Sequence, residues 1–172
     1  ITCITFKTAS KYKCRIVNYR KNINHVEKLK YFANGNTCFY DTLCKTIKQI
    51  RSETKNRGIV AIMTDGEDNS SIKYDLQDVR RLISDCKKDD WIFLFFGRML
   101  ECDKVAEELG IDNDHVVKIG ESQSAVYNSF VALTEAIDDI VVHGDITSEW
   151  KRKAIENSKE SSKKLLLTDK KN

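Results

Sequence analysis

Oxygen-bearing side chains follow an apolar run in the stretch GIVAIMTDGEDNSS, residues 58–71. Asp65 comes two positions after the run IVAIM, at the end of a predicted strand over 59–63. Ligands of an open parallel α/β sheet bind beyond the carboxyl ends of its strands. Asp65 is therefore either a metal ligand at this edge or a turn residue that accepts backbone hydrogen bonds beside Gly66.

A threonine upstream brings a second oxygen to the same edge. Thr37 lies in NGNTCFYDTL, residues 34–43, just before a helical apolar period that begins at Phe39. Its hydroxyl could be the N-cap of this helix, or it could point at the sheet edge and meet the Asp65 carboxylate. Hydroxyl and carboxylate oxygens together suit a hard cation such as Mg²⁺, which prefers six oxygen ligands at about 2.1 Å.

The elements that must hold these residues alternate between strand and helix. β-branched alternation predicts a hairpin, and later apolar runs and periods predict buried strands with helices between them. The strands are expected at 1–6, 13–19, 59–63, 91–96 and 115–119, and the helices at 39–56, 74–88, 102–110 and 124–142. This order predicts an α/β fold: a doubly wound, mostly parallel, Rossmann-like sheet with helices on both faces and one antiparallel edge hairpin.

Length and charge indicate one globular domain with a basic tail. The 172 residues are 41% hydrophobic, and the longest apolar run, WIFLFF, is too short to cross a membrane. We expect the domain over 1–146 and a basic, helical tail over 147–172, in which Trp150, Ala154 and Ile155 could dock on the body. The net charges of residues 1–57, 58–149 and 150–172 are +10, −12 and +5. These segments are expected to neutralise one another, and without any nucleic-acid motif we expect no nucleic-acid partner.

Cysteine and histidine usage indicates neither zinc nor a catalytic centre. No CxxC pair or Cys/His cluster occurs, so buried reduced thiols and a cytoplasmic location are expected. The cysteines are Cys3, Cys14, Cys38, Cys44, Cys86 and Cys102. His25, His115 and His143 have no metal or catalytic companions in the sequence and are expected to be structural or exposed.

Taken together, the ordered motifs resemble the von Willebrand factor A family. Its metal-ion-dependent adhesion site combines a DxSxS stretch, a Thr in a GGT-like turn that opens a helix, and an Asp in a (T/S)DG turn after a buried strand. GNT (35–37) followed by FYDTL is similar to the second motif, and IMTDGEDNS (62–70) is similar to the third. ITCITF matches the strand after the first motif and WIFLFFG the next central strand, so the resemblance covers residues 1–142. It implies that Thr37 and Asp65 are metal ligands.

The family's DxSxS motif does not occur in the 172 residues. By the resemblance, the first strand and its ligands would precede Ile1, and their loss would leave a strand edge open to pairing with another chain or in a homo-oligomer. The implied cofactor is Mg²⁺, or Mn²⁺ or Ca²⁺, held weakly by two protein oxygens. The implied partner is another protein that offers an acidic side chain. The loop residues expected to face it are Gly35, Asn36, Gly66, Glu67, Asp68 and Asn69.

Three functions compete. The first is a non-catalytic, metal-assisted protein-binding domain, and the second is a metal-free scaffold that keeps the fold but not the site. The third is a metal-dependent hydrolase or phosphoryl-transfer enzyme that uses Asp65 and Asp68. No phosphate-cradling glycine loop and no nucleophile with a paired His supports the third, so we expect no enzyme. The remaining loop residues Asn69, Ser70 and Ser71 are expected to be solvated or to cap the next helix.

Overall fold

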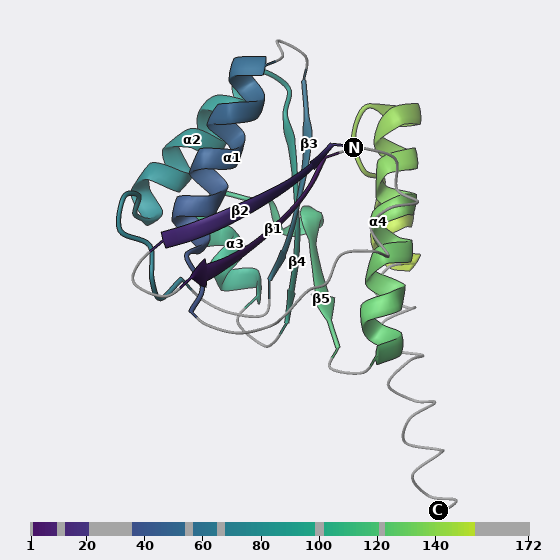
Figure 1. Ribbon diagram of the computed structural model, residues 1–172. Coiled ribbons are helices and arrows are strands. Elements are labelled where there is room, and N and C mark those ends of the chain that lie inside the picture. The colour runs from purple at the N-terminus through teal and green to yellow at the C-terminus, as the bar shows by residue number, and fades with distance from the viewer. Residues whose placement is uncertain are drawn as a thin grey trace, which may run out of the picture. The chain divides into compact units, whose positions relative to one another are not determined.

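Figure 1 shows the chain as a computed structural model. The structure describes residues 2–9, 13–20, 36–53, 57–64, 68–98, 102–120 and 123–153, with side chains from residue 36 onward except at 98, 123 and 124. The chain divides into two compact units. The first consists of residues 1–55 and 67–79, and the second of residues 56–66 and 80–172.

The first unit contains a pair of strands and one helix. Strands β1 (Thr2–Ala9) and β2 (Lys13–Arg20) pair antiparallel along their whole length. They form a two-stranded sheet of their own, so the predicted place at the edge of the parallel sheet stays a prediction. Helix α1 spans Phe39–Glu53 and begins at the predicted residue. Its buried stripe of Phe39, Leu43 and Ile47 follows the predicted helical period.

The second unit contains a three-stranded parallel sheet in the order β3-β4-β5. The bounds are β3 Ile59–Thr64, β4 Ile92–Arg98, β5 Val116–Ile119, α3 Cys102–Leu109, a short 3₁₀ helix Asn113–His115 and α4 Gln123–His143. Helix α2 (Leu76–Lys88) begins in the first unit and continues into the second. The predicted α/β class and parallel sheet are confirmed. The described strands lie in the sheet in the same order as in the chain. The reversal of strand order that defines a doubly wound sheet therefore stays a prediction.

Helices lie on both faces of this sheet, as predicted. Leu94 and Phe96 of β4 form a core with buried residues of α4. Side chains alternate along a strand, so Gly97 belongs to the opposite face. A Cβ atom placed on Gly97 would come within 2.7 Å of the Sγ atom of Cys102, the first residue of α3. Helices α3 and α4 therefore cover opposite faces.

Strand β3 is less buried than its apolar sequence predicts. The run IVAIM indicates a central strand covered on both faces, but Ile62 is the strand's buried residue, whereas Ile59 is 38% exposed and Ala61 is also exposed. The prediction of burial on both faces is wrong for the described structure. The physical reason is that, among the described strands, β3 has one neighbour, β4.

Beyond α4, the chain packs back onto the second unit. The Trp150 side chain is 3% exposed and joins the core formed by α4, β4 and β5. Its indole N–H donates a hydrogen bond to the Ala132 carbonyl oxygen at 2.9 Å. The predicted docking of Trp150 is confirmed, whereas Ala154 and Ile155 lie outside the described residues.

Four cysteines are buried free thiols, as predicted: Cys38, Cys44, Cys86 and Cys102. Burial raises the pKa of the Cys44 thiol to about 11 and also raises the pKa of Cys102, so both stay protonated and unreactive at neutral pH. The side chains of Cys3 and Cys14 lie outside the described part of the chain. Within that part, no helix combines the length and apolarity that a membrane crossing needs.

Candidate functional site

The loop after β3 is fastened to the start of α1 by a two-way pairing within the first unit. The Thr37 main-chain N–H donates to the Asn69 side-chain oxygen at 2.7 Å. In return, the Asn69 main-chain N–H donates to the Thr37 carbonyl oxygen at 3.0 Å. The pair holds one predicted metal ligand, Thr37, directly against the predicted partner-contact loop.

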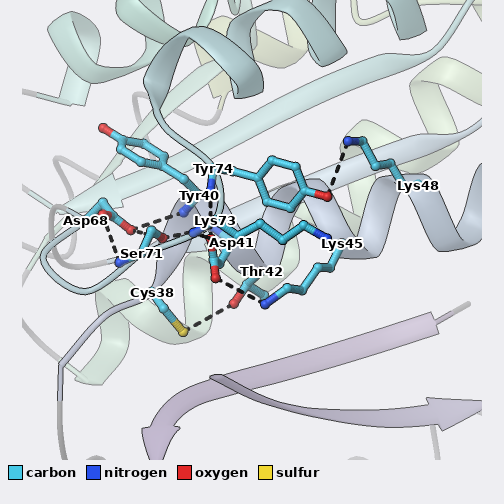
Figure 2. Close-up of polar contacts among 10 residues, drawn as sticks. All are labelled: Cys38, Tyr40, Asp41, Thr42, Lys45, Lys48, Asp68, Ser71, Lys73 and Tyr74. Atoms are coloured by element: carbon cyan, nitrogen blue, oxygen red, sulfur yellow. Dashed lines mark hydrogen bonds and ion pairs between the residues drawn. The ribbon is translucent and has the colours of Figure 1, made fainter. Parts of the chain in front are cut away.

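Two further residues of this loop cap α1 (Figure 2). The Tyr40 main-chain N–H donates to the Asp68 carboxylate at 3.2 Å, and the Asp41 main-chain N–H donates to the Ser71 hydroxyl oxygen at 2.9 Å. The Ser71 hydroxyl in turn donates to the Asp68 carboxylate at 2.5 Å. These are amides of the first helical turn, which have no partner inside the helix and which attract negative charge. Asp68 and Ser71 therefore cap α1 from outside the helix.

This arrangement corrects two predictions. Thr37 is not the N-cap of α1. The helix begins at Phe39, so the N-cap position belongs to Cys38. Asn69 and Ser71 do not cap α2, because Asp75 does so. The Asp78 main-chain N–H donates to the Asp75 carboxylate at 2.9 Å, and the Asp75 N–H donates to the Asp78 carboxylate at 3.2 Å. Such a reciprocal pair satisfies two N–H groups at the helix start without help from Asn69 or Ser71.

Asp41 is a buried anchor that the sequence reading did not single out. Its residue is 6% exposed, and one carboxylate oxygen accepts the main-chain N–H groups of Lys73 and Tyr74, each at 2.9 Å. The other oxygen accepts the Lys45 ammonium at 3.1 Å (Figure 2). The Lys48 ammonium also lies 4.3 Å from the Tyr74 ring centroid. A carboxylate in the apolar first turn of a helix, as in FYDTL, was the available signal.

Electrostatics favour the charged form of Asp41. Burial by itself would raise the pKa of this carboxyl group. The hydrogen bonds from the Lys45 ammonium and from the main-chain N–H groups of Lys73 and Tyr74 outweigh burial and lower the pKa below its ordinary value. Asp41 is therefore ionised, and its carboxylate links α1 to the loop.

The predicted metal ligands are only partly placed. Thr37 is half-buried and Asn36 exposed, while Gly35, Asp65, Gly66 and Glu67 lie outside the described residues. Across the described ranges, no group of three or more His, Cys, Asp or Glu side chains could hold a metal ion. The carboxylates of Asp41 and Asp68 already accept hydrogen bonds from the protein. The described residues therefore do not make up a metal site by themselves, and Asp65 would have to contribute.

Two histidines lie in the second unit, away from the carboxyl ends of its strands. One ring nitrogen of His115 is 3.1 Å from the Phe93 carbonyl oxygen, and the other is 3.2 Å from the Asp145 carboxylate. His115 lines a cavity of about 240 Å³ at the amino ends of β4 and β5, with Arg57 and Trp91 among its other walls. His143 is exposed, with a ring nitrogen 3.8 Å from an Asp139 carboxylate oxygen. These contacts agree with the predicted structural or exposed roles.

The described elements thus define an α/β fold with a parallel sheet in the second unit. The candidate site lies in the first unit, where residues 68–71 contact the start of α1. No family model, no curated protein and no solved structure matches the chain. The resemblance to the von Willebrand factor A family therefore depends on the sequence motifs alone.

Replacing Asp68 by alanine is expected to lower the free energy of unfolding by about 1–2 kcal/mol, because the Tyr40 N–H and the Ser71 hydroxyl lose their acceptor. Urea denaturation followed by circular dichroism measures the change. Asp85→Ala is the matched control, since Asp85 is half-exposed and pairs with Lys88 on the surface of α2. It should cost less than about 0.5 kcal/mol. Equal losses in the two variants would show that Asp68 does not cap α1.

Proposed function

We propose that this chain is a protein–protein interaction module of the von Willebrand factor A type. It binds an acidic side chain of a partner protein through a divalent cation at the carboxyl edge of a doubly wound, Rossmann-like sheet. The observation that supports this most directly is the two-way pairing of Thr37 with Asn69, which seats the loop after β3 on the start of α1. We also propose a cytoplasmic location, which the free thiols of the four described cysteines support.

The short stretch of chain between Asp65 and Asp68 limits how far Asp65 can lie from the loop that contacts α1. Consecutive Cα atoms are about 3.8 Å apart, so the Cα atom of Asp65 lies within about 11 Å of that of Asp68 in any conformation. Asp68 is itself bonded to the first turn of α1, just after Thr37. The chain length therefore permits the Thr37 hydroxyl and the Asp65 carboxylate to share one cation, as the proposal requires.

The chemistry of this pair suits binding rather than catalysis. One hydroxyl and one carboxylate neutralise little of the charge of Mg²⁺, so the ion stays electrophilic and attracts a carboxylate from a partner. Two protein oxygens also hold the ion only weakly. In the family, the serines and the first aspartate of DxSxS complete the coordination, and an upstream segment with that motif would do the same here.

A metal-free interaction module is the alternative, and a specific observation favours it. Asp41 and Asp68 hold the loop on α1 through hydrogen bonds within the protein, with no cation required. The same surface could then receive a partner directly. The commitment of Asp68 to α1 also removes one of the two carboxylates that a hydrolase would use, so the enzyme hypothesis gains no support.

The test is Mn²⁺ binding, followed by electron paramagnetic resonance on the natural full-length protein. Asp65→Ala and Thr37→Val should each weaken binding at least about tenfold, whereas Thr37→Ser, which keeps the hydroxyl, should retain it. Asp85→Ala is the control for loss of a surface carboxylate. Equal binding by all four variants would refute the metal role of Thr37 and Asp65. No binding by the unmodified protein would favour the metal-free module.

A further inference from the structure

A cavity of about 240 Å³ lies at the amino ends of the strands in the second unit. All of its lining residues belong to that unit. Trp91, Phe93 and Ile111 supply apolar walls, and each is at most 5% exposed. A water molecule takes up about 30 Å³, so the cavity has room for about eight waters or for one small organic molecule. Apolar walls with a few polar groups are typical of small-molecule sites.

The indole N–H of Trp91 is a donor without an acceptor. Trp91 is 5% exposed, and no described residue accepts a hydrogen bond from its indole. Among the described residues, Thr46 carries the one unpaired polar side-chain atom that is sealed from solvent, so the Trp91 nitrogen keeps a path to solvent. Because Trp91 lines the cavity, the cavity supplies that path. A buried indole N–H usually has an acceptor, and a ligand in the cavity would provide one.

Arg57 and Asp90 line the same cavity with opposite charges and do not pair with each other. The parallel register sets Ile59 beside Ile92, and each charged residue lies two positions before one of these. Both side chains are exposed, and neither forms an ion pair or a side-chain hydrogen bond with any described residue. The guanidinium is therefore available to a carboxylate of a ligand, and the Asp90 carboxylate is available to an ammonium group.

The other charged groups of the cavity wall already have partners. The Lys87 ammonium donates to the Asp112 carboxylate at 2.6 Å, and a ring nitrogen of His115 lies 3.2 Å from the Asp145 carboxylate. Around the cavity as a whole, three carboxylates stand against two cations and one histidine. A wall without an excess of positive charge does not attract a phosphate or another polyanion. It suits a ligand that carries one charge of each sign.

We infer that this cavity binds a free α-amino acid with an apolar side chain. The carboxylate of the amino acid pairs with the Arg57 guanidinium and accepts the Trp91 indole N–H. The ammonium group pairs with the Asp90 carboxylate, and the side chain packs on the apolar walls. Leucine is of the size that the cavity accommodates. The site belongs to the second unit, involves no metal and is independent of the proposed function.

Nuclear magnetic resonance of the full chain, titrated with L-leucine, tests this inference. The protein has two tryptophans and therefore two indole N–H signals. The Trp91 signal should move with a dissociation constant of about 1 mM or tighter. The Trp150 signal should stay in place, because its N–H is bonded to the Ala132 carbonyl oxygen. Isocaproate, which lacks the ammonium group, and isoamylamine, which lacks the carboxylate, should each bind at least about tenfold more weakly.

Two variants test the charged groups. Arg57→Met and Asp90→Asn should each weaken leucine binding at least about tenfold. Asparagine tolerates the positive φ of 57° at position 90, so Asp90→Asn removes the charge and keeps the backbone conformation. Both side chains are exposed, so neither substitution should change the melting temperature. Arg81→Met and Asp85→Asn, on the surface of α2, are the matched controls and should bind leucine as the unmodified protein does.

Three results would overturn the inference. An unmoved Trp91 signal at about 10 mM leucine would show that the cavity takes no amino acid, whether it stays open or another part of the chain fills it. Equal binding of isocaproate or isoamylamine would show that only one of the two charges is recognised. Unchanged binding by Arg57→Met or Asp90→Asn would show that leucine binds elsewhere. None of these measurements involves Mn²⁺, so failure here is distinct from failure of the proposed metal site.

Discussion

Replacing Asp41 by alanine is expected to lower the free energy of unfolding by about 3 kcal/mol, one of the two largest losses we predict for a single substitution in this protein. The substitution removes the acceptor of the Lys73 and Tyr74 main-chain N–H groups and leaves them without a partner beside α1. It also removes the carboxylate to which the Lys45 ammonium donates a hydrogen bond. Urea denaturation followed by circular dichroism measures the loss.

Two variants separate the contributions to this anchor. Asp41→Asn keeps an oxygen that can accept the two main-chain N–H groups, so it should cost about 1–2 kcal/mol. Lys45→Met removes a partner whose side chain is 37% exposed, so it should cost less than about 1 kcal/mol. If Lys45→Met cost as much as Asp41→Ala, the main-chain contacts would contribute nothing and the anchor would be a simple ion pair.

Asp41 also makes the free energy of unfolding depend on pH in the acid range. The pKa of Asp41 is lower in the folded protein than its ordinary value of 3.8, so the ionised form stabilises the fold. This contribution is complete above the unfolded-state value and is lost as the pH falls below it and through the folded-state pKa. Below about pH 4, the unmodified protein should therefore lose stability more steeply than Asp41→Asn. An equal loss of unfolding free energy with falling pH in the unmodified protein and in Asp41→Asn would contradict this.

Replacing Trp150 by alanine is expected to lower the free energy of unfolding by about 4 kcal/mol. The side chain is 3% exposed in the core of the second unit, so the substitution leaves a cavity between α4 and the sheet. It also leaves the Ala132 carbonyl oxygen without the indole N–H. Thermal and urea denaturation measure the loss, and the intrinsic fluorescence of Trp91 reports the transition in the variant.

Trp150→Phe is the matched control, because it keeps most of the aromatic volume and removes the indole N–H. It should cost about 1–2 kcal/mol, from the lost hydrogen bond and a small cavity. Ending the chain after Ile146 should be at least as destabilising as Trp150→Ala, since it removes the whole contact. A stable protein that ends at Ile146 would show that the turn around Trp150 is an accessory to the core.

Local sequence was sufficient to predict most elements. The apolar period from Phe39 predicted α1 from its first residue, and the run WIFLFF predicted β4. Gly110 ends α3 with a positive φ of 78°, as its position in the sequence indicated. These predictions succeed because periodicity and turn chemistry operate over a few residues and do not depend on distant partners.

The candidate site was less predictable, because its contacts join residues about thirty positions apart. The N-cap role was one of two alternatives for Thr37, suggested by its nearness to α1, yet Asp68 and Ser71 perform the capping from another loop. Asp41 carried no signal strong enough to single it out, because the main-chain groups that fill its two oxygens come from Lys73 and Tyr74. A sequence shows which groups need partners but not which distant group will supply them.

By itself, the sequence determined the α/β alternation, the buried thiols and the two motifs that resemble a metal-dependent adhesion site. Only the tertiary structure decided which neighbours each element has. It left β3 with one described partner strand despite its apolar sequence, brought Trp150 into the core and seated Asn69 on Thr37. The physical reason is that hydrophobic periodicity encodes the local need for burial, whereas burial itself depends on which segments are present to pack together.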